Sequence, residues 1–72
     1  MTRLEKLETL IKIEEAIQYY ENQVHELVYS NQLGAGNMFI SIRLKNTHDI
    51  EIYEMCIDRL NERFNKLVNT LK

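Results

Sequence analysis

The chain has no proline and no tryptophan, and only two of its 72 residues are glycine. Without proline, no segment carries the residue that most often breaks a helix by removing a backbone donor. Both glycines, Gly34 and Gly36, lie in one stretch near the middle of the chain, "NQLGAGNMFISIRLKN", residues 31–46. These absences leave two long stretches free to be helical and mark one place for a turn.

Cysteine is almost absent as well, which limits how so short a chain can be stabilised. Residues 1–72 form a single small domain, and a domain of this size buries too little surface for a large core. Cys56 is the only cysteine, so no intramolecular disulfide can form. Adding His25 and His48 still falls short of a structural zinc site, which takes about four Cys or His ligands. We therefore expect no metal and no cofactor, and self-association or a partner protein as the stabilising contact, although well-packed helices can also suffice for a monomer.

Long apolar runs are missing too. No stretch approaches the roughly 20 apolar residues that cross a bilayer as a helix. Arg3, Glu5 and Lys6 interrupt the start of the chain, where a secretory signal would be apolar. With one free cysteine, these features predict a cytoplasmic protein that does not contact a membrane. The small size would also suit a phage or mobile-element protein.

The charge of the chain is weakly acidic and unevenly distributed. The net charge is −2, which disfavours a general attraction to nucleic acid or anionic lipid. Residues 32–48, however, contain Arg43 and Lys45 and no acidic residue. A small basic patch near the middle of the chain is therefore expected.

The first long stretch, from Thr2 to about Gln32, has the periodicity of a helix. Apolar residues recur at alternating spacings of three and four, which predicts a helix that packs along one stripe. The stripe consists of Leu10, Ile13, Ile17, Tyr20, Val24 and Leu27. Gly34 or Gly36 is expected to end this helix, because glycine tolerates the left-handed conformation of a C-terminal cap.

A second helix is predicted at about 48–71 from an uninterrupted stripe of the same kind. Its start is expected at Thr47 or Asp49, whose side chains can cap a helix N-terminus. The stripe consists of Ile50, Tyr53, Ile57, Leu60, Phe64, Leu67 and Leu71.

The segment between these helices has no clear period. A short helix over 38–46, capped by Asn37, is the prediction. Loose alternation in "FISIRL" and "IEIYEM" would also allow a β-hairpin, which the unbroken helical stripe over 50–71 disfavours. The predicted fold is thus all-α: an antiparallel αα-hairpin of two long helices with a short middle helix, assembled as a dimeric helical bundle.

Several apolar residues lie outside both stripes and are the candidate interaction sites. Contiguous exposed apolar patches commonly mark binding surfaces. Leu4, Leu7 and Ile11 point about 120° away from the first stripe and are the predicted self-association residues. The predicted partner-binding residues are Met38, Phe39, Ile52, Met55, Tyr19 and Tyr29. The sequence also allows the alternative that the middle segment folds over Ile52 and Met55 and completes a monomeric core.

Catalytic patterns are weak, and we expect no enzymatic activity. His25 and His48 are the only histidines, the residue type most often used as a general base, and neither has a nucleophile beside it in the sequence. Cys56 borders the second stripe, where a small buried hydrophobic side chain is its expected role. The glycines of "LGAGN" lack the Gly-Lys-Ser/Thr of a phosphate-binding loop.

The alternative to protein binding is DNA binding by residues 33–46. Their spacing partly matches a helix-turn-helix, in which a glycine-containing turn precedes the recognition helix. The side chains that would contact nucleic acid are Ser41, Arg43, Lys45 and Asn46. Against this, Arg43 occupies a position that usually holds an apolar residue, and two basic residues supply little phosphate affinity.

The function predicted from the sequence is therefore non-enzymatic protein binding. The chain would act as an inhibitor, adaptor or assembly factor, and it would associate with itself, with a larger protein, or with both.

Overall fold

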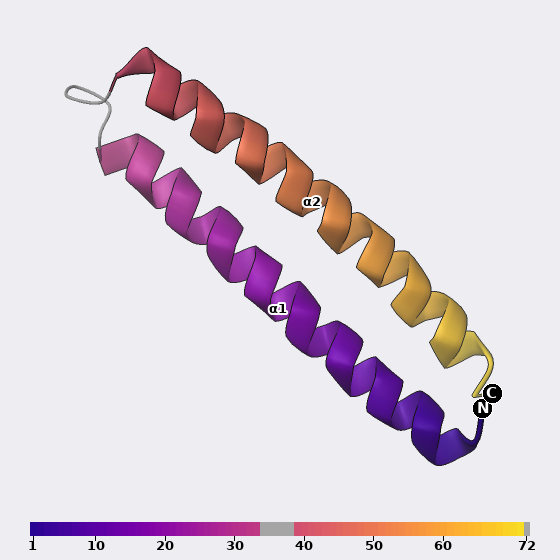
Figure 1. The fold of residues 1–72 in the computed structure, drawn as a ribbon. Coiled ribbons are helices and arrows are strands. Elements are labelled where there is room, and N and C mark those ends of the chain that lie inside the picture. The colour runs from indigo at the N-terminus through magenta and orange to yellow at the C-terminus, as the bar shows by residue number, and fades with distance from the viewer. Residues whose placement is uncertain (34–38, 72) are drawn as a thin grey trace.

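Two helices packed side by side make up the fold. The computed structural model describes residues 1–33 and 39–71. Helix α1 runs from Arg3 to Leu33 and helix α2 from Ile40 to Asn69. Figure 1 shows them antiparallel, with both chain termini at one end and the connection at the other. The predicted all-α hairpin is confirmed, and the described ranges contain no strand, so the β-hairpin alternative is wrong.

The predicted break between a middle helix and the second helix is absent. Helix α2 starts at Ile40 and passes through Thr47 and Asp49 without interruption. Residues 40–46 are therefore its first turns, and neither Thr47 nor Asp49 caps a helix. The Thr47 hydroxyl instead donates to the carbonyl oxygen of Arg43 at 2.9 Å, one turn back in the same helix. The expected cap Asn37 and the glycines lie outside the described residues.

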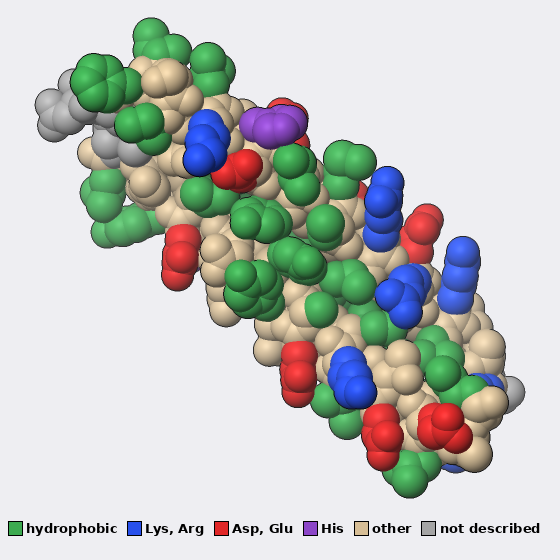
Figure 2. Space-filling model, viewed as in Figure 1, with side chains coloured by type: hydrophobic (Ala, Val, Ile, Leu, Met, Phe, Trp, Pro, Cys, Tyr) green, Lys and Arg blue, Asp and Glu red, His purple; other side chains and the backbone are tan. Residues whose placement is uncertain are grey.

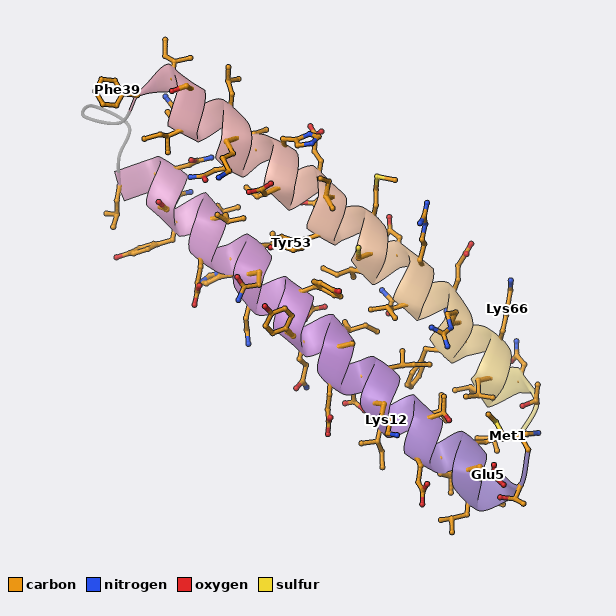
Figure 3. The ribbon with its side chains drawn as sticks, in the orientation of Figure 1. Met1, Glu5, Lys12, Phe39, Tyr53 and Lys66 are labelled. Carbon is orange, nitrogen blue, oxygen red and sulfur yellow. The ribbon has the colours of Figure 1, made fainter. Side chains whose placement is uncertain are left out.

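The N-terminus of α2 begins at an apolar residue. Phe39 holds the N-cap position with an extended backbone (φ −62°, ψ 141°) and makes no side-chain capping bond. Its carbonyl oxygen accepts the backbone N–H groups of Ile42 and Arg43. The Phe39 side chain is thus left to project from the end of the hairpin, where Figure 3 labels it.

The N-terminus of α1 is closed by a reciprocal capping box. The Thr2 hydroxyl accepts the backbone N–H of Glu5 at 3.1 Å, and the Glu5 carboxylate accepts the backbone N–H of Thr2 at 3.3 Å. This satisfies two donors that a helix start otherwise leaves free. The negative charge of Glu5 also lies at the positive end of the helix dipole.

The core is a single seam between the two helices. Leu10 and Ile13 are the buried hydrophobic residues, and the remaining stripe residues are half-buried. The molecule measures 53 × 14 × 14 Å, with a radius of gyration of 16.3 Å. A compact domain of this length would have a radius of gyration of about 11 Å. The hairpin is therefore a thin rod in which each seam residue keeps an open side.

Three polar or aromatic contacts link the helices along the rod. Near the connection, the Asn46 side-chain amide donates to the Asn31 side-chain oxygen at 3.1 Å in a partly buried position. Midway, the rings of Tyr20 and Tyr53 lie 5.6 Å apart, and Figure 3 shows Tyr53 between the helices. At the open end, Lys6 Nζ donates to the carbonyl oxygen of Thr70 at 3.3 Å. These contacts favour one register of the two helices.

Two isoleucines in α1 test the assignment of the seam. Ile13 is 5% exposed and Ile11 is 56% exposed. Ile13→Ala should lower the free energy of unfolding by about 2–4 kcal/mol, because it opens a cavity in the seam. Ile11→Ala, the matched control, should change it by less than about 0.5 kcal/mol. Urea denaturation followed by circular dichroism measures both values, and a larger loss at Ile11 would show that another surface covers it.

Candidate interaction surfaces

The hairpin exposes more surface than a compact protein of its mass. Its accessible surface is 5749 Å², whereas a compact monomer of 8.6 kDa would have about 4,700 Å². The difference, about 1,000 Å², is similar to the roughly 800 Å² that each partner buries in a standard protein–protein interface. Exposed apolar side chains contribute to this surface, and three regions of the rod are candidates for contact with another protein.

The first cluster lies at the connection end and is here called the tip cluster. It consists of Leu33, Phe39, Ile40 and Leu44, all of which are more than half exposed. Phe39 is 76% exposed, the largest value among the large apolar side chains in residues 1–33 and 39–71. Figure 2 shows hydrophobic side chains crowded at this end of the rod. Of the predicted partner-binding residues, Phe39 belongs to this cluster and Tyr29 lies one turn before the end of α1, whereas Met38 is outside the described residues.

The second cluster lies at the open end of α1. It holds the predicted self-association residues Leu4, Leu7 and Ile11, which are exposed as expected. Helical spacing places them on the same flank of α1 as Glu14 and Glu21. A shallow groove on this flank is lined in part by Glu14, Gln18, Glu21 and Asn61. This flank, here called the acidic flank, therefore joins an apolar end to a negatively charged middle.

The third cluster lies on the opposite flank, at the middle of the rod. Tyr19 packs edge-on against Tyr20, with ring centroids 5.5 Å apart, and Tyr20 in turn contacts Tyr53. A shallow depression beside them is lined by Tyr20, Cys56, Arg59, Leu60 and Arg63. We call this flank the tyrosine face. In Figure 2, hydrophobic side chains continue along the middle of the rod over both helices.

Two of the predicted partner-binding residues lie far apart along the rod. Phe39 and Met55 are sixteen positions apart in one continuous helical segment, which corresponds to about 24 Å along its axis. Met55 lies among Asp58, Arg59 and Glu62 on the outer side of α2. Ile52 and Met55 are both exposed, so the middle segment does not fold over them to complete a core.

The candidates for chemistry are scattered along the rod. His25 and His48 are exposed on different helices, and Cys56 is half-buried at the edge of the seam. Among the described residues, no three His, Cys, Asp or Glu side chains are grouped so that they would hold a metal ion. Within the same residues, no helix has the length and apolar character needed to cross a membrane.

The residues suggested for DNA contact do not share one exposed face. Asn46 is engaged with Asn31, and Arg43 lines a groove with Val28, Asn31, Gln32 and Ile50. Ser41, Arg43 and Lys45 are exposed, whereas Asn46 is half-buried. A helix-turn-helix also joins its helices at about 90–120°, whereas α1 and α2 lie antiparallel (Figure 1).

Three features of these surfaces were not predicted from the sequence. The Asn31–Asn46 bond joins residues fifteen positions apart, and no local pattern signals such a pair. The capping box does have a sequence signal, the Thr-x-x-Glu spacing of Thr2 and Glu5, although the predicted helix start did not include it. The tyrosine contacts required knowledge of how the two helices align.

No family model, curated protein or solved structure matches the chain. A functional proposal must therefore come from the three clusters and the charges around them.

DNA binding can be tested directly on the purified protein. We expect no retardation of mixed-sequence duplex DNA at low salt, where phosphate contacts are strongest, because Arg43 and Lys45 are the only basic residues of the segment 33–46 and offer little charge. If retardation does occur, Lys45→Ala and Arg43→Ala should weaken it and reduce its dependence on salt. Retardation that responds in this way would contradict our expectation and favour the DNA-binding alternative.

Proposed function

We propose that this chain is a non-enzymatic protein-binding hairpin that associates with itself and with a larger protein. The observation that carries the proposal is the surface excess of about 1,000 Å² over a compact monomer, to which exposed apolar side chains contribute. Of the residues that the structure describes, the two-helix rod buries only Leu10 and Ile13 well. A further protein surface over the open apolar side chains would supply the burial that the seam lacks.

The tip cluster is the proposed docking surface for the larger protein. It combines an aromatic side chain with aliphatic neighbours, and aromatic anchors often dominate binding energy. The first turns of α2 also carry Arg43 and Lys45 without an acidic residue before Asp49. The tip cluster therefore fits best a partner protein whose apolar surface is bordered by acidic side chains. Binding of this kind suits an inhibitor, adaptor or assembly factor, and a cytoplasmic location stays a prediction from the sequence.

Self-association is tested by the mass of the purified protein. We expect light scattering at tens of micromolar to give about twice the 8.6 kDa of one chain, because a dimer covers the open seam. A mass of one chain over this concentration range would remove self-association from the proposal.

The two phenylalanines of the chain separate docking from folding. Phe39 is exposed at the tip, whereas Phe64 is half-buried in the seam. Phe39→Ala should leave the thermal transition nearly unchanged and weaken partner binding about thirty-fold, the effect of losing an anchor worth about 2 kcal/mol. Phe64→Ala should lower the free energy of unfolding by up to about 3–5 kcal/mol.

The measurements are thermal melting by circular dichroism and capture of a partner from nuclease-treated lysate of the source cells. Captured protein that is retained by wild type and lost with Phe39→Ala supports the docking surface. A collapsed melting transition for Phe39→Ala would mean that the tip only stabilises the hairpin, and equal capture by wild type and Phe39→Ala would exclude the tip as the docking surface.

A further inference from the structure

We propose that a second copy of the chain covers the tyrosine face in antiparallel orientation, so that the two connections lie at opposite ends of a four-helix bundle. This inference rests on the self-association proposed above and adds the face, the orientation and the paired residues. In this arrangement α1 lies against the partner's α1, and α2 against the partner's α2. The twofold axis crosses the rod near its middle, beside Tyr19 and Cys56.

Charge selects this face over the acidic flank. On the acidic flank, Glu14 and Glu21 face the groove beside Asn61, and a symmetric contact there would bring carboxylates together. On the α1 side of the tyrosine face, the positions bordering the seam recur every seventh residue and are uncharged. They are Thr9, Ala16, Gln23 and Ser30, all half-buried. A second helix can approach them closely without burying an unpaired charge.

The spacing of charges in α2 selects the orientation. Asp49 lies seven residues before Cys56, and Arg63 lies seven residues after it. Seven residues are nearly two helical turns, so the three side chains border the same side of the seam. When two copies of α2 run antiparallel with Cys56 at the axis, each Asp49 faces Arg63 of the partner subunit. The twofold symmetry produces this pair twice.

The spacing of charges in α1 independently selects the same antiparallel orientation. Lys12 lies seven residues before Tyr19, and Glu26 lies seven residues after it. With Tyr19 at the axis, each Lys12 faces Glu26 of the partner subunit, and the two Tyr19 rings meet. Because Tyr20 and Cys56 line one depression, the axis inferred from α1 and the axis inferred from α2 cross the rod at nearly the same level.

The parallel arrangement lacks these pairs. It would place α1 against the partner's α2, with the connections at the same end. The contacts Lys6–Thr70 and Tyr20–Tyr53 set the register of the hairpin. In this register Arg63 lies near the level of Lys12 and Asp49 near the level of Glu26, so the parallel dimer would bring like charges to the same level. A second copy would also cover part of the surface by which the hairpin exceeds a compact monomer, about 1,000 Å² per chain, which is of the same order as the roughly 800 Å² that each partner buries in a standard interface.

A charge swap tests the Asp49–Arg63 pairing. Asp49→Arg and Arg63→Asp alone should each raise the dimer dissociation constant about tenfold, because each places like charges opposite one another twice. The double variant Asp49→Arg/Arg63→Asp should return the constant to within about threefold of wild type, because the pairing is restored with its signs exchanged. Analytical ultracentrifugation measures the three constants, and circular dichroism confirms that each variant stays helical.

Cysteine crosslinking tests the position of the axis. Diamide oxidises two thiols to a disulfide and takes up the two hydrogens, and the bond requires Cα atoms within about 7 Å. Wild type should form a Cys56–Cys56 dimer at high yield. The matched control is Cys56→Ser/Gln18→Cys, whose thiol lies at a similar level of the rod on the acidic flank and should crosslink poorly.

The outcomes distinguish failure of the antiparallel bundle from failure of the proposed self-association. Dimerisation with rescue by the charge swap and crosslinking at Cys56 supports the antiparallel bundle. Two results would overturn the face proposed here but retain self-association. One is a dimer that crosslinks through Gln18→Cys, and the other is a dimer that dissociates with Leu7→Glu but not with Arg63→Asp. A dimer with no rescue and no Cys56 crosslink overturns the orientation. If the protein is monomeric at tens of micromolar, the antiparallel bundle and the proposed self-association are both excluded.

Discussion

The seam between α1 and α2 is the contact on which the rest of the structure depends. Two helices touch along one line, so each apolar residue of a stripe faces one neighbour and keeps its other side open. Among the described residues, only Leu10 and Ile13 fall below a tenth of their full exposure, and both lie in the half of α1 nearer the chain termini. The elongated shape, the excess surface and the three apolar clusters all follow from having one packing line instead of a closed core.

The helices were predictable because their signal is local. Apolar spacing of three and four depends only on neighbouring residues, and it located both stripes correctly. The continuity of α2 was missed because the stripe continues upstream through Arg43 and Asn46, which are polar. As a pattern of hydrophobicity the stripe stops at Ile50, although the helical spacing continues without a break to Phe39, the N-cap residue of α2.

The candidate surfaces were only partly predictable, because they depend on the alignment of two helices. Exposure of Leu4, Leu7 and Ile11 followed from the helical angle alone. The grouping of Tyr19, Tyr20 and Tyr53 needed the register that the Asn31–Asn46 bond favours near the connection. The separation of Phe39 and Met55, both predicted to bind a partner, could not be read from the sequence either, because it depends on one straight helix that holds them about 24 Å apart.

The positions of the clusters determine what an antiparallel dimer would do. The tyrosine face would be covered, whereas the tip clusters would remain open, one at each end of a rod 53 Å long. One dimer would then present two identical docking surfaces that point away from each other. Such an arrangement cannot place both tips on a single small partner, but it suits the bridging of two partner molecules or of two sites on one large assembly, where the second contact gains from effective concentration. Among the three roles proposed for the chain, this geometry favours an adaptor or assembly factor over a simple inhibitor.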